Sequence, residues 1–86
     1  MAVAVTGLGA LTPLGPDVAA LTEGLLTGRS GVRLLEGEQW DALPARLAAT
    51  VDLEGRLERI EARTLDRVQQ LALIAAREAW EDAGSP

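Results

Sequence analysis

An apolar run that breaks at glycines is the strongest constraint on how this chain folds. Residues 2–15 read AVAVTGLGALTPLG, and a helix-forming segment follows. Residues 2–6 are apolar without alternation, which favours a strand covered on both faces of a sheet. Gly7 and Gly9 interrupt this strand, and the prolines that follow them predict turns. The chain is therefore expected to begin as an α/β unit of strand, loop and helix.

Glycines directly after a strand are also typical of phosphate-binding loops. Gly7-Leu8-Gly9 matches the start of the dinucleotide-binding pattern G-x-G-x-x-G, but Thr12 stands where the third glycine belongs. The helix is expected to start only after Pro16, so the glycine amides would not lie at its N-terminus. The sequence also lacks the Gly-Lys-Ser/Thr of a P-loop. We therefore interpret Gly7 and Gly9 as a structural turn that lets the strand leave its sheet.

The spacing of apolar residues predicts a first helix over residues 17–27. Pro16 suits the first helical position, and the carboxylate of Asp17 suits the positive end of the helix. Gly28 is a good left-handed stop. Beyond it, a short extended piece is expected at residues 32–35, a second strand at 45–51, and a helical turn within 52–61.

The longest predicted element is a helix over residues 66–83. Asp66 can cap this helix, with Gln69 in the capping-box position, and Gly84 ends it. Residues 71–76 are apolar all round, which indicates burial on more than one side. On its outer face an Arg77–Glu81 pair is expected at the i, i+4 spacing.

Composition bounds what the chain can do alone. Its 86 residues allow one domain at most, and its 48% hydrophobic content includes only two aromatic residues, Trp40 and Trp80, so the core would be thin. A net charge of −5 argues against nucleic acid and anionic membranes as partners. The N-terminus lacks the basic region of a signal peptide, and no apolar run reaches the roughly 20 residues of a membrane span. A cytoplasmic location is expected.

Several polar and aromatic residues are candidates for a functional role. The chain has no Cys and no His, and it offers no nucleophile–base arrangement. An acidic trio, Glu36, Glu38 and Asp41, lacks the spacing of a calcium loop and is interpreted as part of a solvated loop. Asp66 and Arg67 are interpreted as a helix cap and an ion pair. The tryptophans are expected at packing or partner surfaces, and Arg46 beside an acidic neighbour.

Short motifs follow one another in a fixed order along the chain. They are VTGLGALTPLG at residues 5–15, LLTGRSGV at 25–32, LPARLA at 43–48, LDRVQ at 65–69, and AAREA followed by DAG within 75–84. Together these motifs resemble the β-ketoacyl-acyl carrier protein synthases, the elongating condensing enzymes of type II fatty acid synthesis. The resemblance covers essentially the whole chain.

The resemblance implies a thiolase-like αβαβα fold and a homodimer. Residues 1–86 would be the N-terminal part of an incomplete domain, cut after its first long helix, in the order strand, loop, helix, strand, long helix. The family performs a decarboxylative Claisen condensation with malonyl-acyl carrier protein. A Cys takes the acyl chain from acyl carrier protein, and two His assist decarboxylation. No residue here matches those positions, so no catalytic, cofactor-binding or metal residue is assigned, and no cofactor is expected.

Two other readings remain open at the level of sequence. The parent protein could be a non-catalytic chain-length factor or a type II polyketide ketosynthase, which share the scaffold. Alternatively, the 86 residues could form a free-standing acidic interaction module. A Cys in a strand-to-helix turn further along the reading frame, with two later His, would identify a catalytic synthase. Folding of the isolated chain would identify a free-standing module.

Overall fold

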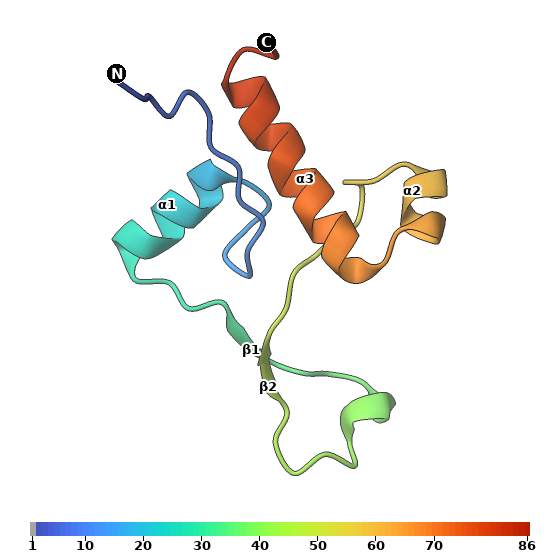
Figure 1. Ribbon diagram of the computed structural model, residues 1–86. Helices are drawn as coiled ribbons and strands as arrows, with labels where there is room; N and C mark the ends of the chain where they lie inside the picture. The colour runs from blue at the N-terminus through green and yellow to red at the C-terminus, as the bar shows by residue number, and fades with distance from the viewer. Residues whose placement is uncertain (1) are drawn as a thin grey trace.

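The computed structural model describes residues 2–86 as three α-helices and one small hairpin (Figure 1). In chain order the elements are α1 (Val18–Thr27), β1 (Val32–Leu34), a 3₁₀ turn (Glu38–Trp40), β2 (Leu47–Ala49), α2 (Arg59–Thr64) and α3 (Arg67–Asp82). This mixture of helices and sheet confirms the expected α/β character. The helical turn expected within residues 52–61 lies slightly later, as α2.

The capping residues place both long helices close to where the sequence predicts them. The Oδ1 atom of Asp17 accepts a hydrogen bond from the Ala20 amide at 2.8 Å, so Asp17 is the N-cap of α1 and Pro16 precedes the cap. This corrects the expectation that Pro16 takes the first helical position. Gly28 ends α1 in the left-handed conformation, with φ of 70°.

The predicted capping box of α3 is confirmed. The Gln69 amide donates to Oδ1 of Asp66 at 2.9 Å, and Oε1 of Gln69 accepts from the Asp66 amide at 3.1 Å. These reciprocal bonds satisfy two of the amides that a helix start leaves unpaired. At the other end, Gly84 leaves the helix with φ of 90°.

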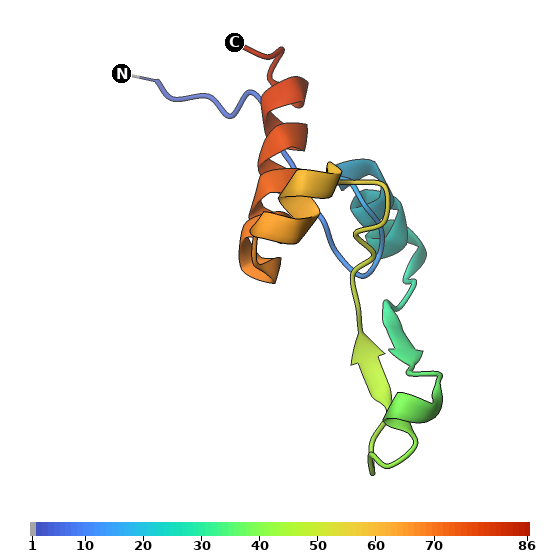
Figure 2. The ribbon, with the colours of Figure 1, turned by 90° about the vertical axis from the view of Figure 1, so that its right-hand side faces the viewer.

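The two strands form an antiparallel hairpin that projects from the rest of the molecule (Figure 2). We call residues 29–50 the hairpin arm. Val32 pairs with Ala49, and Leu34 with Leu47, so these apolar side chains share one face of the arm. That face is exposed: Leu47 keeps 71% of its accessible surface. The strand predicted over 45–51 is therefore confirmed, although only its three central residues are paired.

The strand predicted at residues 2–6 is not formed. The segment runs unpaired beside the upper part of α3 (Figure 1), and Val3 and Val5 are 91% and 80% exposed. A strand needs a neighbour to take its backbone hydrogen bonds. Within residues 2–86 the only two strands pair with each other in the hairpin arm, so no neighbour is available to this segment.

The molecule is far more open than a compact domain of its length. Its radius of gyration is 15.9 Å, whereas a compact chain of this length has about 12 Å. Its accessible surface is 6748 Å², whereas a folded monomer of this mass exposes about 4,900 Å². Among the described residues, Ile74 is the one large apolar side chain that is buried. The core is thus even thinner than composition suggests.

Candidate functional site

The loop that follows residues 2–6 lies directly on the backbone of α3. A Cβ atom built on Gly9 would overlap the carbonyl oxygen of Ala75, and one built on Gly7 would overlap that of Ala79. The same Cβ on Gly7 would also lie 2.7 Å from the Ala83 amide nitrogen. Only glycine, which has no Cβ atom, lets the loop backbone approach the backbone of α3 this closely. The alanines recur every fourth residue, and they form a flat face along one side of α3.

This close approach corrects the expected role of the two glycines. Gly7 and Gly9 do not have the positive φ of turn glycines, which Gly15 has at 158°. The tight turn comes later, where Thr12 and Gly15 exchange two backbone hydrogen bonds of 3.0 Å each. Gly7 and Gly9 are therefore structural, as interpreted from the sequence, but they serve contact with the helix rather than chain reversal.

Two carboxylates of α3 hold the loop in place. Glu78 accepts from the Ala10 amide through Oε1 at 2.8 Å and from the Val18 amide through Oε2 at 3.0 Å. One turn further on, Asp82 accepts from the Leu8 amide at 3.0 Å. Glu78, in the C-terminal half of α3, thereby joins that helix to the loop and to the first residue of α1. We call this group of contacts the glycine-loop clamp.

The clamp leaves little for a phosphate to bind. A phosphate loop offers free backbone amides to the anion. Here the amides of Leu8 and Ala10 already donate to carboxylates. These negative charges would also repel a phosphate at the same place. The geometry thus supports a structural role for the segment.

The sequence carries a signal for the clamp that the interpretation of Gly7 and Gly9 as a turn leaves out. Glu78 and Asp82 are spaced by four residues on a helix that is otherwise apolar in its middle. A carboxylate on a helix face that packs against the chain needs hydrogen-bond donors. That requirement could have pointed to the backbone amides of the glycine loop.

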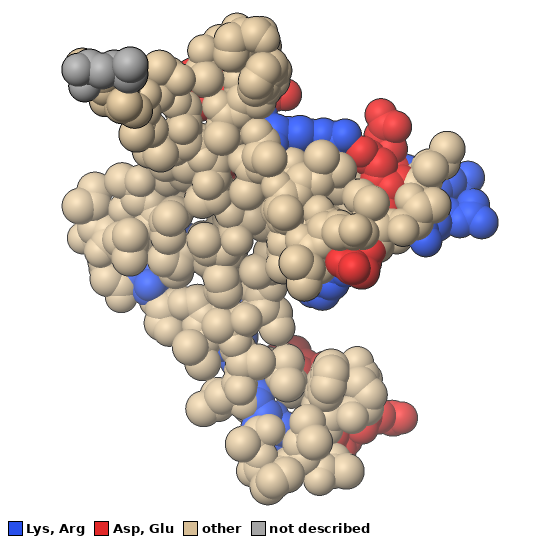
Figure 3. All heavy atoms as spheres, in the orientation of Figure 1, with Lys and Arg blue, Asp and Glu red and all other residues tan. Residues whose placement is uncertain are grey.

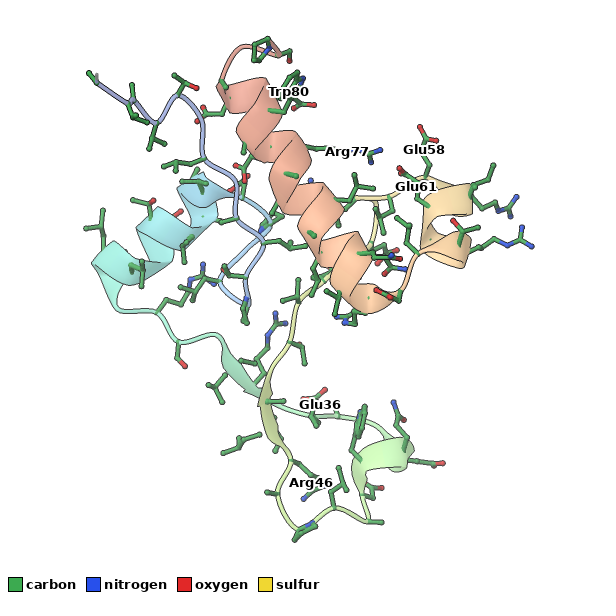
Figure 4. All side chains as sticks on the ribbon, in the orientation of Figure 1. Glu36, Arg46, Glu58, Glu61, Arg77 and Trp80 are labelled. Carbon is green, nitrogen blue, oxygen red and sulfur yellow. The ribbon has the colours of Figure 1, made fainter. Side chains whose placement is uncertain are left out.

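A second cluster fastens α2 to α3. Arg77 reaches across to α2, where Glu58 and Glu61 lie (Figure 4). Its guanidinium binds both carboxylate oxygens of Glu61, with Nη1 to Oε1 at 3.0 Å. The same Oε1 accepts from the Glu58 amide at 3.0 Å, which completes the capping box of α2. The expected Arg77–Glu81 pair is therefore wrong, because a bidentate partner from another helix outcompetes a neighbour on the same one.

The electrostatics of this cluster follow from its hydrogen bonds. The Arg77 guanidinium, and after it the Glu58 amide, lower the pKa of Glu61 from its ordinary value of 4.5. The hydrogen bond to Glu61 correspondingly raises the pKa of Arg77. The Glu61 side chain is only 19% exposed, but that of Arg77 is 47% exposed, so water and salt screen the pair. Its role is to orient α2.

The acidic trio on the arm does not form a cation site. Glu36, Glu38 and Asp41 are exposed, and in the described part of the chain no three carboxylate, His or Cys side chains gather as metal ligands. Asp41 instead accepts from Arg46 at 3.4 Å, which confirms the expected acidic neighbour of Arg46. Figure 4 shows Glu36 and Arg46 on the arm.

The remaining candidates have mainly structural contacts. Asp66 caps α3 as expected, but Arg67 donates to the Val51 carbonyl oxygen at 3.0 Å rather than to a carboxylate. Trp80 is 56% exposed on α3 and lines a shallow groove with Val5. Trp40 is half-buried in the arm. A partner surface at either tryptophan stays a prediction.

A small cleft separates the Thr12–Gly15 turn from the base of the arm. Its volume is about 110 Å³. Two arginines, Arg33 and Arg56, and two acids, Asp52 and Glu54, line it. These side chains are exposed, and their mixed charge selects neither an anion nor a cation.

Most of the face seen in Figure 3 is uncharged, with charged side chains gathered around α2 and on the arm. An apolar stripe flanks the contact between α3 and the glycine loop, made of Ala72, Leu73 and Ala76 on the helix and Leu65 just before it. Among the described helices, none is both long and apolar enough to cross a bilayer. Large uncovered apolar surface marks a place of contact with other protein.

Comparison with known proteins identifies relatives of this chain. Residues 1–86 match the family described as "Beta-ketoacyl synthase, N-terminal domain". The chain is 37% identical over 84 residues to "3-oxoacyl-[acyl-carrier-protein] synthase 2" of Staphylococcus aureus (strain COL). It is 38% identical over 85 residues to the protein of the same name from Coxiella burnetii (strain RSA 493 / Nine Mile phase I). These alignments cover 94% and 95% of the chain but only 20% of each relative. Because the family match extends over all 86 residues, this chain belongs to the β-ketoacyl synthase family, within its N-terminal domain.

Proposed function

We propose that this chain is the N-terminal scaffold segment of a 3-oxoacyl-[acyl-carrier-protein] synthase. Such an enzyme is an acyltransferase that elongates acyl chains in fatty acid biosynthesis, by decarboxylative Claisen condensation with malonyl-acyl carrier protein. The observation that carries the proposal is the alignment over 94% of the chain with relatives that bear this name. Acyl carrier protein is then the partner that delivers both substrates.

The fold proposed for the whole enzyme is thiolase-like, αβαβα, with residues 1–86 as an incomplete part of its N-terminal domain. The surface excess supports this. The chain exposes about 1,900 Å² more than a compact monomer of its mass would. That excess is more than twice the roughly 800 Å² that one partner contributes to a standard protein–protein interface. An intact domain would cover it with its own remaining elements.

Each uncovered feature has a natural place in such a domain. The unpaired residues 2–6 would become a strand once neighbouring strands supply hydrogen bonds on their two edges. The apolar stripe of α3 would pack against a further layer. The glycine-loop clamp would then fix how this first strand enters the sheet, because it sets the distance between the loop backbone and α3.

The segment contributes position rather than chemistry. It contains neither Cys nor His. In the proposed enzyme, the Cys that takes the acyl chain and the two His that assist decarboxylation come from sequence beyond residues 1–86. The proposal includes a homodimer in the cytoplasm.

The proposal is tested on the protein encoded by the complete reading frame. We expect a downstream Cys in a strand-to-helix turn, followed by two His. With an acyl-acyl carrier protein primer and malonyl-acyl carrier protein, the purified protein should release CO₂ and form 3-oxoacyl-acyl carrier protein. Replacing the downstream Cys with Ala should abolish condensation while leaving the fold intact. A reading frame without that Cys, or a folded protein without condensation activity, would contradict the enzymatic assignment.

A further inference from the structure

We draw no further inference here: the strongest candidate, the unpartnered apolar stripe along α3 formed by Leu65, Ala72, Leu73 and Ala76, carries nothing beyond the proposed fold because nothing in the structure shows which segment or partner covers it.

Discussion

Gly7 and Gly9 show how one residue type can serve two different purposes in similar sequence. Glycines after a strand can present amides to a phosphate or can let two backbones meet. The sequence excludes a complete nucleotide motif, because Thr12 replaces the third glycine. It does not reveal the second purpose, because the contacting backbone at Ala75 and Ala79 lies more than 60 residues away in the chain.

Replacing Gly9 with Ala in the intact protein should lower its stability. The new methyl group would overlap the Ala75 carbonyl oxygen, and a helix backbone cannot yield as a side chain can. We expect a loss at the upper end of the about 1–3 kcal/mol typical of overpacking, measured by denaturant unfolding. Gly55 is the matched control, because a Cβ there meets nothing within 4 Å and Asn tolerates its φ of 75°. Equal stability of Gly9→Ala and Gly55→Asn would refute the contact.

Glu78 is the residue whose removal should loosen the clamp most. In Glu78→Gln one amide oxygen remains to accept, so the amide of either Ala10 or Val18 loses its partner. Leaving a partly buried donor unpaired costs about 1–3 kcal/mol. Glu81→Gln, on the exposed side of the same helix, should change the unfolding free energy by less than about 0.5 kcal/mol. Faster amide exchange at residues 10 and 18 in the Glu78 variant alone would support the assignment, whereas similar effects of both variants would count against it.

At the level of elements, prediction succeeds where the signal is local. The start and end of α1 and the start of α3 follow from Asp17, Gly28 and Asp66, whose capping bonds reach only three or four residues along the chain. Prediction fails where a distant partner decides the outcome. Residues 2–6 have the composition of a strand but lack a neighbour, and Arg77 takes a partner from α2 that sequence spacing could not reveal.

The Glu61–Arg77 pair gives α2 a pH dependence with a definite sign. The folded-state pKa of Glu61 lies below its ordinary value of 4.5. The stabilisation is therefore complete above pH 4.5 and is lost as the pH falls through the folded-state pKa. Arg77→Gln should accelerate amide exchange in α2 at pH 7 relative to the unmodified protein, with a smaller difference near pH 3. High salt should also reduce the difference, because much of Arg77 faces water. A difference that does not change with pH would show that the ion pair does not hold α2.

At the level of the whole molecule, the family match and the exposed surface both support the proposal that residues 1–86 are part of a larger domain. With one large apolar side chain buried among residues 2–86, the chain gains little from the hydrophobic effect. Ordering its backbone costs about 1–2 kcal/mol per residue. The incomplete domain that we propose would explain both the open shape and the alignment with only 20% of each relative. A free-standing module would need a core that the described residues do not have.

Hydrogen exchange on the isolated 86-residue chain tests most directly the proposal that these residues need the rest of a larger domain to fold. Amides in the middle of α3 are the best reporters, because they form the longest helix and contact the glycine loop. The account predicts that they exchange at rates close to those of an unstructured chain, and that the same amides are strongly protected in the full-length protein. The account would be contradicted by a monomeric 86-residue chain whose α3 amides are strongly protected and exchange only through unfolding of the whole chain.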